Sequence, residues 1–346
     1  MCTIAVWLHI HRQLTQFTSY FASAQEFCQI LYFAHLSSLN LLIMPTPVLS
    51  VIDVLRRGLV FLKIDLLGRY SRNQREVEFH KHYGSPALTL AAMWYDMTRT
   101  DIEGAKLSEK EKRRGLKSFL IAHFYMWNYT KNSHGLASRF DICEHYARGA
   151  RLWDWIQHIA AMKERVIVWD PDLDAADGAI MGITIDATDK VRNEVKHATL
   201  NIDKKQCSHK HKHAASKWQL ALSVNKSKIV DIYGPCRGGM NDKPMLEASG
   251  ILDKLAPGKL AIVDCGYIKD ANKDKLSWPN PHDDTVTNNY KSRARLRHET
   301  VNGRMAFFYI LSRQFHHSTA KHKAAFEAVA VTVQYQMDNG HPLFAV

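Results

Sequence analysis

The hydrophobic pattern of this chain changes its period near residue 180, and that change limits the available folds more than any other feature. Before it, apolar residues such as Val51 and Leu55 recur at the spacing of an α-helix. After it, Ile183 and Ile185 flank a polar residue, and the segment 218–224 alternates in the same way. We therefore expect a helical part followed by a part built on a β-sheet.

This change divides the chain into four predicted regions. They are an atypical apolar extension (1–45), a helical region (46–168), an acidic linker (169–179) and a domain with a sheet (180–346). The linker contains several aspartates, but it lacks the glycine and the closing glutamate that a calcium-binding loop requires. We therefore interpret it as a connection between the two folded parts.

The extension 1–45 contains an apolar run over Phe27–Met44. Gln29, His35 and Asn40 interrupt this run, so it makes a poor membrane span. The cationic start of a signal peptide is also missing. An extra helix outside the main fold is the favoured interpretation, and membrane anchoring is the less favoured one.

The charge of the chain favours a polyanionic partner. Its 46 Lys and Arg residues exceed its 34 Asp and Glu residues, which gives a formal net charge of +12. Cationic side chains that neutralise phosphates release counterions, so DNA is the expected partner. The six cysteines form no Cys-x-x-Cys pair, which disfavours a zinc ribbon. Neither a P-loop motif nor Gly-x-Ser-x-Gly occurs, which disfavours a P-loop NTPase and an α/β-hydrolase.

Two successive helical segments in the first half predict a helix-turn-helix. The segment 134–143 leads through a turn into a second predicted helix, 144–162. Arg148 and Arg151 would lie on the outer face of that second helix, near DNA phosphates or base edges. An ordinary helical hairpin within a core is the alternative.

Past residue 180 the predicted elements alternate between strands and helices. In chain order they are a strand ending at Asp186, a hairpin over 218–232, a helix over 242–255, a buried strand over 260–263, a polar loop over 268–290 and a long helix beginning near Ser292. This order predicts an α/β fold with a central mixed sheet and flanking helices.

Three acidic residues stand where such a fold could bring them together. Asp186 and Asp264 each close a predicted strand, and open sheets use strand ends for ligand sites. Glu299 lies on the late helix. Three carboxylates favour Mg²⁺ or Mn²⁺, and two such ions can promote phosphodiester cleavage. We therefore predict these three residues as the catalytic acids and metal ligands of a nuclease, with Asp189 as the alternative first ligand.

Cationic residues crowd the third acid. Arg293, Arg295 and Arg297 precede Glu299 on the same predicted helix, and we expect them to hold DNA phosphates beside the ions. The alternative is that Glu299 is only the salt-bridge partner of these arginines.

Five further residues complete the predicted site. Asp242 would cap its helix or support the acids, and Asn302 lies about one turn from the third acid. His209, Lys210 and Lys212 belong to a basic loop that we expect to contact the DNA backbone. A metal site formed by the histidines of this loop is the alternative.

Four sequence motifs around these acids occur in the order and context of one known family. The motifs are 185–188 at the first acid, 234–235 with 239–242 between the acids, 262–267 at the second acid and 291–304 at the third. With these motifs, residues 80–346 resemble the PIF/Harbinger-type DDE superfamily endonucleases, a branch of the transposases. Ala187 stands where that family usually has Gly, and Asn241 stands where it usually has His.

The resemblance implies an RNase H-like fold, a three-acid site for two Mg²⁺ ions and cleavage of DNA strands. It also implies an upstream helix-turn-helix, a nuclear location and help from a separate Myb-like DNA-binding protein, and it leaves a homodimer open. The alternative is a catalytically silent, transposase-derived protein that only binds DNA.

Overall fold

The structure is a computed structural model that describes residues 49–346 apart from 100–108, 131–132, 170–179, 194–203 and 268–273. The predicted extension 1–45 and nearly all of the predicted linker therefore lie outside the described residues. Leu49–Val346 forms one compact unit. No helix in the described ranges has the length and apolar character needed to cross a membrane.

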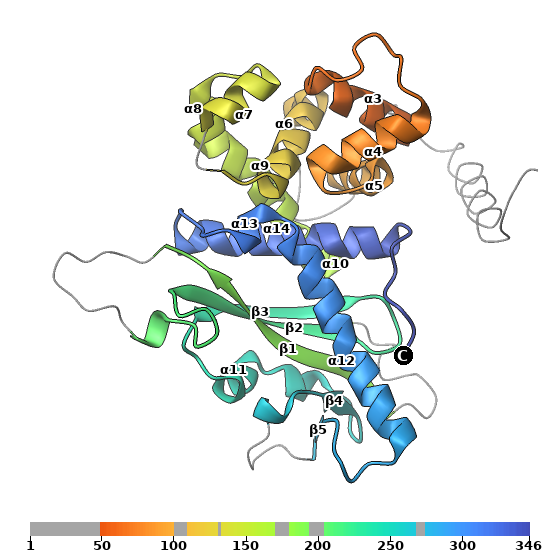
Figure 1. Cartoon of the computed structure of the whole chain (residues 1–346), viewed down its shortest axis with the longest axis vertical. Coiled ribbons are helices and arrows are strands. Elements are labelled where there is room, and N and C mark those ends of the chain that lie inside the picture. Colours follow the sequence, from red (N-terminus) through yellow and green to blue (C-terminus); the bar gives the residue numbers. More distant parts are fainter. Residues whose placement is uncertain (1–48, 100–108, 131–132, 170–179, 194–203, 268–273) are drawn as a thin grey trace, which may run out of the picture. The chain divides into compact units, whose positions relative to one another are not determined.

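The first part of the compact unit is helical, as the periodicity predicts (Figure 1). Ser50 and Ser71 begin its first two helices with capping boxes, in which each serine side chain accepts a backbone N–H and the third helical residue returns the contact. The helices are α3 (Val51–Phe61), α4 (Arg72–Tyr83), α5 (Ala87–Thr98), α6 (Glu109–Trp127), α7 (Ser133–Phe140), α8 (Glu144–Arg148), α9 (Ala150–Ala161) and α10 (Lys163–Val166).

The second part contains a five-stranded mixed sheet in the order β3-β2-β1-β4-β5. The strands β1, β2 and β3 are antiparallel neighbours, whereas β4 runs parallel to β1 and β5 runs parallel to β4. The strands are β1 (Met181–Val191), β2 (Ala215–Ser223), β3 (Ile229–Arg237), β4 (Leu260–Ile262) and β5 (Leu276–Ser277). The fold is thus of the mixed α/β class, as predicted.

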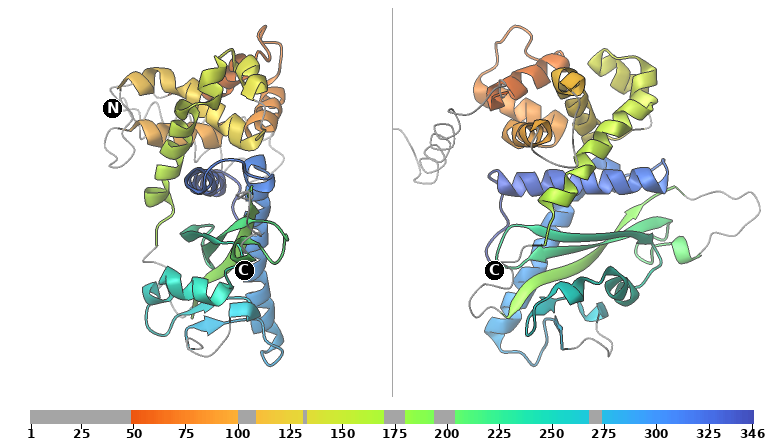
Figure 2. Two further views of the ribbon diagram at one scale, coloured as in Figure 1. Left: turned by 90° about the vertical axis from the view of Figure 1, so that its left-hand side faces the viewer. Right: turned by 180° about the vertical axis from the view of Figure 1, so that it is seen from behind.

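Helices lie on both faces of this sheet (Figures 1 and 2). One face packs against α11 (Asp242–Ser249) and the 3-10 helix Ile251–Lys254 that follows it. The other faces α12 (Thr285–Ala306), α13 (Tyr309–Ser312) and α14 (Thr319–Asp338). Alternation along each strand assigns successive side chains to opposite faces.

The helix α14 joins the helical part to the sheet. Its buried residues belong to the same hydrophobic core as α5, α9 and strand β2. On one side Phe326 stacks on Trp218 of β2, with ring centroids 4.2 Å apart. On the other, Tyr335 donates a hydrogen bond to Asp96 at 2.6 Å. One core therefore runs from the helical part to the sheet.

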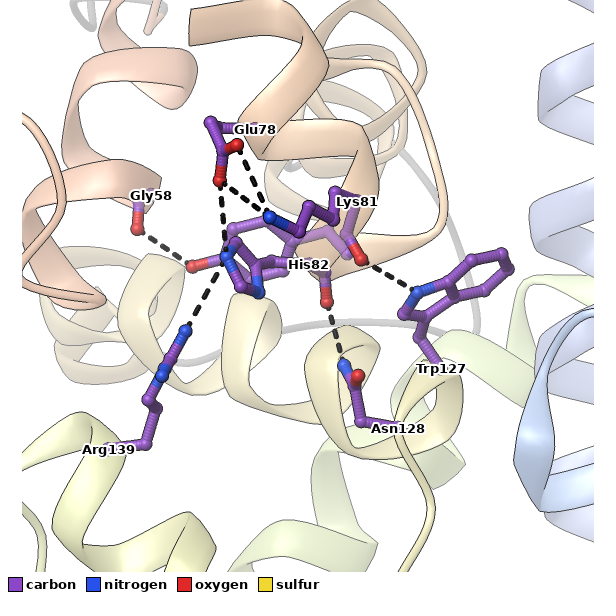
Figure 3. Close-up of polar contacts among 8 residues, drawn as sticks. Gly58, Glu78, Lys81, His82, Trp127, Asn128 and Arg139 are labelled. Carbon is purple, nitrogen blue, oxygen red and sulfur yellow. Dashed lines mark hydrogen bonds and ion pairs between the residues drawn. The ribbon is translucent and has the colours of Figure 1, made fainter.

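The C-terminal end of α4 is fixed to the end of α6 by two side-chain hydrogen bonds (Figure 3). Trp127 donates from Nε1 to the carbonyl of Lys81, and Asn128 donates from Nδ2 to the carbonyl of His82, both at 2.9 Å. A helix leaves its last carbonyls without partners inside the helix, and these two side chains supply them. The Trp127 indole is thereby held in one orientation.

Four boundaries differ from the prediction. β1 continues five residues past Asp186, because β2 pairs with it as far as Val191. α12 begins at Thr285, where Asp284 accepts the backbone N–H of Thr287, well before the predicted start. The short strand β5 lies inside the predicted loop 268–290. The predicted helix 144–162 is interrupted by Gly149, whose extended backbone separates α8 from α9.

Candidate active site: carboxylates on β1 and after β4

The first predicted acid lies on β1, and the second follows the neighbouring parallel strand β4. Ile183 of β1 pairs with Ala261 of β4, and Thr184 pairs with Ile262. The same register, continued two residues beyond the end of β4, sets Asp186 beside Asp264. This is the adjacency that the sequence analysis expects, although Asp186 lies within its strand rather than at its end.

Both aspartates occupy the face of the sheet that α12 covers. Thr184 points to that face, since its Oγ1 lies 2.6 Å from Nε2 of His298 on α12. Ile185 belongs instead to the core on the opposite face, with α11. Because strand side chains alternate, Asp186 shares the face of Thr184. Asp264 follows the same alternation and lies 3.4 Å from Nη2 of Arg295 on α12.

The same alternation separates Asp186 from its rival, Asp189. An odd number of residues along β1 places Asp189 on the opposite face of the strand. There its Oδ2 accepts a hydrogen bond from Ser208. The geometry therefore favours Asp186 over Asp189 as the partner of Asp264.

Glu299 approaches the aspartates from α12. Its side chain is exposed, and its negative charge contributes to the raised pKa of Asp186. Arg295 stands one turn earlier on the helix and Asn302 about one turn later. The structure thus brings all three predicted acids into one electrostatic neighbourhood, with Arg295 in contact with one of them.

Burial makes the charge of Asp186 costly. Desolvation raises the pKa of this carboxyl to about 6, and the negative charges of Glu299 and Asp242 add to the effect. A backbone hydrogen bond from Ala187 and the charge of Arg295 act in the opposite direction. A nearby cation would therefore stabilise the ionised form of Asp186.

Two more residues belong to this neighbourhood. Asp242, the first residue of α11, lies 2.7 Å from Nζ of Lys217 on β2. Tyr267 is buried, and its hydroxyl finds no hydrogen-bond partner among the described residues. Burial and the nearby charges of Asp242, Asp186 and Asp264 raise the pKa of Tyr267, so its hydroxyl stays protonated. Asp242 is the residue that the sequence analysis expects to support the site.

The donor atoms suit a hard divalent cation, although they are not assembled around one point. Across the described ranges, no group of three His, Cys, Asp or Glu side chains is close enough to hold a metal ion as it stands. All the candidate ligands are nevertheless oxygen donors, which Mg²⁺ and Mn²⁺ prefer. A further oxygen, Oδ1 of Asn302, is buried and has no hydrogen-bond partner in the part of the chain described. The residues therefore fit such an ion in chemistry and in neighbourhood.

Most of the predicted DNA-binding residues are exposed on the surface. His209, Lys210 and Lys212 lie exposed in the turn before β2, and Arg151 is exposed on α9. The side chain of Arg148 lies outside the described part of the structure.

Arg297 requires a correction. It is only 2% exposed, and its guanidinium donates to the carbonyls of Val224 and Lys226 in the β2–β3 turn. A group in that position cannot hold DNA phosphate. Arg293 is exposed, as predicted, although it also donates to the carbonyl of Ala345 at 2.8 Å.

The sequence does not predict Lys217 or Tyr267 as neighbours of the acids, nor the burial of His298 beside Glu299. His298 is flanked by charged residues, and nothing in the local pattern indicates that it is buried. The one available signal is positional, because Tyr267 follows Asp264 within the second motif and His298 precedes Glu299 within the third.

Comparison with known proteins finds a family match over the segment that carries the three acids. Residues 186–334 match the family described as DDE superfamily endonuclease, a span of less than half the chain. The match begins at Asp186 and includes Asp264 and Glu299. Neither the curated proteins nor the solved structures contain a match to the chain. The similarity supports a transposase-like nuclease domain.

Proposed function

We propose that the chain is a metal-dependent DNA endonuclease of the DDE type. One observation carries this proposal: Asp186 and Asp264 occupy adjacent register positions on one face of the sheet, with Glu299 entering from the helix that covers that face. The match of residues 186–334 to DDE superfamily endonucleases supports the same reaction class.

Asp186, Asp264 and Glu299 would hold the two divalent ions, with Asn302 and Asp242 beside them. When bound, such ions lower the pKa of water and stabilise the leaving oxygen of a phosphodiester. The chain itself contributes the positions of the oxygens. β1 and β4 fix the two aspartates relative to each other, and α12 sets the distance between Glu299 and the aspartates.

Arg295 gives the acids a counter-charge when no ion is present. It contacts Asp264, and its charge opposes the rise in the pKa of Asp186. The guanidinium is partly exposed, so it can turn from the carboxylates to a DNA phosphate. Arg293 and the basic turn at His209, Lys210 and Lys212 would extend the phosphate contacts, consistent with the net charge of +12.

The finer assignments belong to the same proposal. The order of the motifs supports a PIF/Harbinger-type enzyme with an RNase H-like sheet, acting in the nucleus. The segment predicted as a helix-turn-helix contains α7, α8 and α9, and Arg151 of α9 would contact DNA. A Myb-like protein partner follows from the family resemblance.

A nicking assay tests the proposal. Purified protein is incubated with supercoiled plasmid and Mg²⁺ or Mn²⁺, beside the Asp264→Asn variant. We expect nicking by the wild type and at least a hundredfold slower nicking by the variant, because a ligand is lost. Asp253→Asn is the matched control, since Asp253 is a highly exposed carboxylate outside the site. Equal nicking by wild type and Asp264→Asn would disprove the assignment.

A DNA-binding protein that no longer cuts is the second candidate. The observation that favours it is the contact of Arg295 with Asp264, which neutralises part of the site within the protein. This candidate predicts retained DNA binding with no nicking by either protein. The same assay, combined with a binding titration, therefore separates the two functions.

A further inference from the structure

A pocket of about 200 Å³ lies at the C-terminal end of α12, where four other segments meet. Its lining combines aromatic rings with groups that can carry positive charge, and no described lining residue is acidic. The lining residues are His80, Gly84, Pro86, Trp127, Arg304, Phe307, Phe308, Gln336 and His341.

The aromatic walls are held in place before any ligand binds. Hydrogen bonding to the carbonyl of Lys81 fixes the Trp127 indole, as Figure 3 shows. Phe308 packs edge-on against that indole, with ring centroids 5.2 Å apart. Phe307 lies 6.4 Å from it, centroid to centroid, yet remains 66% exposed. An exposed ring beside a fixed indole leaves apolar surface available to a flat ligand.

The positive charge of the pocket belongs to Arg304. Arg304 donates to the carbonyls of His341 and Pro342, so the described contacts of its guanidinium are with neutral groups. Burial lowers the pKa of both His80 and His341, so their imidazoles are neutral at physiological pH. Aromatic walls beside the guanidinium of Arg304 complement a planar ring that carries an anionic group.

The pocket and Glu299 share the helix α12. Arg304 follows Glu299 by five residues, which is about 7.5 Å along the axis. Around the axis, the exposed Leu296 and Phe307 lie between these two residues, over an arc of about 140°. A strand leaving the acids along the exposed side of α12 would therefore reach Phe307 and the pocket.

We propose that this pocket binds an unpaired nucleobase of the DNA strand, with Trp127 and Phe307 as stacking surfaces and Arg304 beside the attached phosphate. The inference rests on the proposed function, because DNA at the acids brings the base to the pocket. Every base has an aromatic face, so such a pocket recognises unpaired DNA with little dependence on sequence. An aromatic protein segment is the rival occupant.

The test measures the binding of two DNA probes to the wild type and to a variant that lacks the exposed ring of Phe307. The probes are a blunt duplex and the same duplex with a short single-stranded tail, both titrated in EDTA so that no cleavage occurs. Phe307→Ala should weaken binding of the tailed duplex about fivefold or more, the lower range for loss of base stacking, and leave the blunt duplex unchanged. Val286→Ala, on the same helix and 79% exposed, is the matched control and should change neither.

A second measurement locates the contact. 5-Iodouracil in the tail, irradiated in the complex, should cross-link to the peptide that contains Phe307 or Trp127. The proposal would be overturned if Phe307→Ala weakened binding of both probes equally or of neither. Cross-links to other peptides alone would overturn it as well. Because binding is measured without metal, a failed nicking assay with a retained tail preference would refute the nuclease and leave the pocket standing.

Discussion

The charge of Asp186 destabilises the folded protein, yet the same charge suits a metal-binding site. Its carboxyl is buried among other acids, and desolvation raises its pKa to about 6. Without a bound cation, the ionised form is therefore less stable in the folded protein than in the unfolded chain. The same position gives a divalent ion a strongly attracting ligand.

The pH dependence of stability follows from that shift. The folded-state pKa of Asp186 lies above the unfolded value near 3.8, so the folded protein binds more protons between those values. The contribution of this group to stability is thus present at low pH and declines as pH rises from about 4 to about 6. Asp186→Asn should raise the free energy of unfolding by about 1–2 kcal/mol at pH 7 in EDTA.

Urea unfolding of both proteins at pH 4 and pH 7 measures this effect. The gain should be small at pH 4, because that pH lies close to the unfolded pKa of 3.8 and well below the folded pKa of about 6. Asp253→Asn serves as the control because its carboxylate is 87% exposed and should show no comparable gain. A stability gain that is the same at both pH values would contradict the assigned shift.

At the scale of elements, α12 is positioned by two buried polar residues. Arg297 reaches the carbonyls of Val224 and Lys226 in the β2–β3 turn. His298 contacts Thr184 on β1. Burial lowers the pKa of His298 to about 3, so its imidazole is neutral at physiological pH. Glu299 follows these two residues directly, and the helix that they anchor sets its position.

Replacing Arg297 by Met should therefore damage the fold before it affects DNA contacts. The change leaves two carbonyls without donors, and we expect the free energy of unfolding to fall by about 1–3 kcal/mol. Nicking should fall as well, because Glu299 loses its support. Arg293→Met, on the exposed side of the same helix, should cost less than about 1 kcal/mol. Reduced DNA affinity with unchanged stability in Arg297→Met would restore the phosphate role predicted from sequence.

The join of α4 and α5 depends on Gly84. Its φ of +71° lies in the left-handed region, and an added Cβ would come within 2.1 Å of Cε3 of Trp127. Gly84→Ala should lower the free energy of unfolding by more than about 2 kcal/mol, since strain and a clash combine. Gly68 is the matched control, with φ of +67° and its nearest neighbour, on Arg75, at 3.8 Å. Gly68→Ala should lower the free energy of unfolding by only about 1–2 kcal/mol, as measured by thermal unfolding. Equal losses of stability in the two variants would mean that the clash with Trp127 contributes nothing.

Some elements could be predicted from sequence and others could not, for physical reasons. β1, which carries Asp186, and β4, which precedes Asp264, have strong apolar patterns, so the neighbouring positions of the two acids follow from the fold class. The start of α12 has no apolar period before Tyr290, and β5 has only two residues. Charge usually indicates exposure and so predicts Arg297 at the surface, whereas inside the protein backbone carbonyls accept hydrogen bonds from Nη1 and Nη2 of its guanidinium.

At the scale of the molecule, α14 belongs to both halves of the chain. Its faces pack against helices of the first half and against the sheet. Gln336 donates to the carbonyl of Gly84 at 2.9 Å and to Oγ of Ser85 at 2.8 Å. Lys163 forms an ion pair with Glu327 at 3.1 Å. The predicted boundary between 46–168 and 180–346 therefore separates segments that share a core.

A chain restricted to 180–346 should accordingly fail to fold as an independent domain. It would expose the side of α14 that α5 and α9 cover, and an apolar surface of that kind drives association. A chain restricted to 49–346 should instead unfold in one cooperative transition, because the shared core couples the two halves. Calorimetry of 49–346 and sedimentation of 180–346 measure the two outcomes. Two separate transitions in 49–346, with a monomeric and stable 180–346, would mean that the halves fold independently and that the contacts of α14 contribute little to stability.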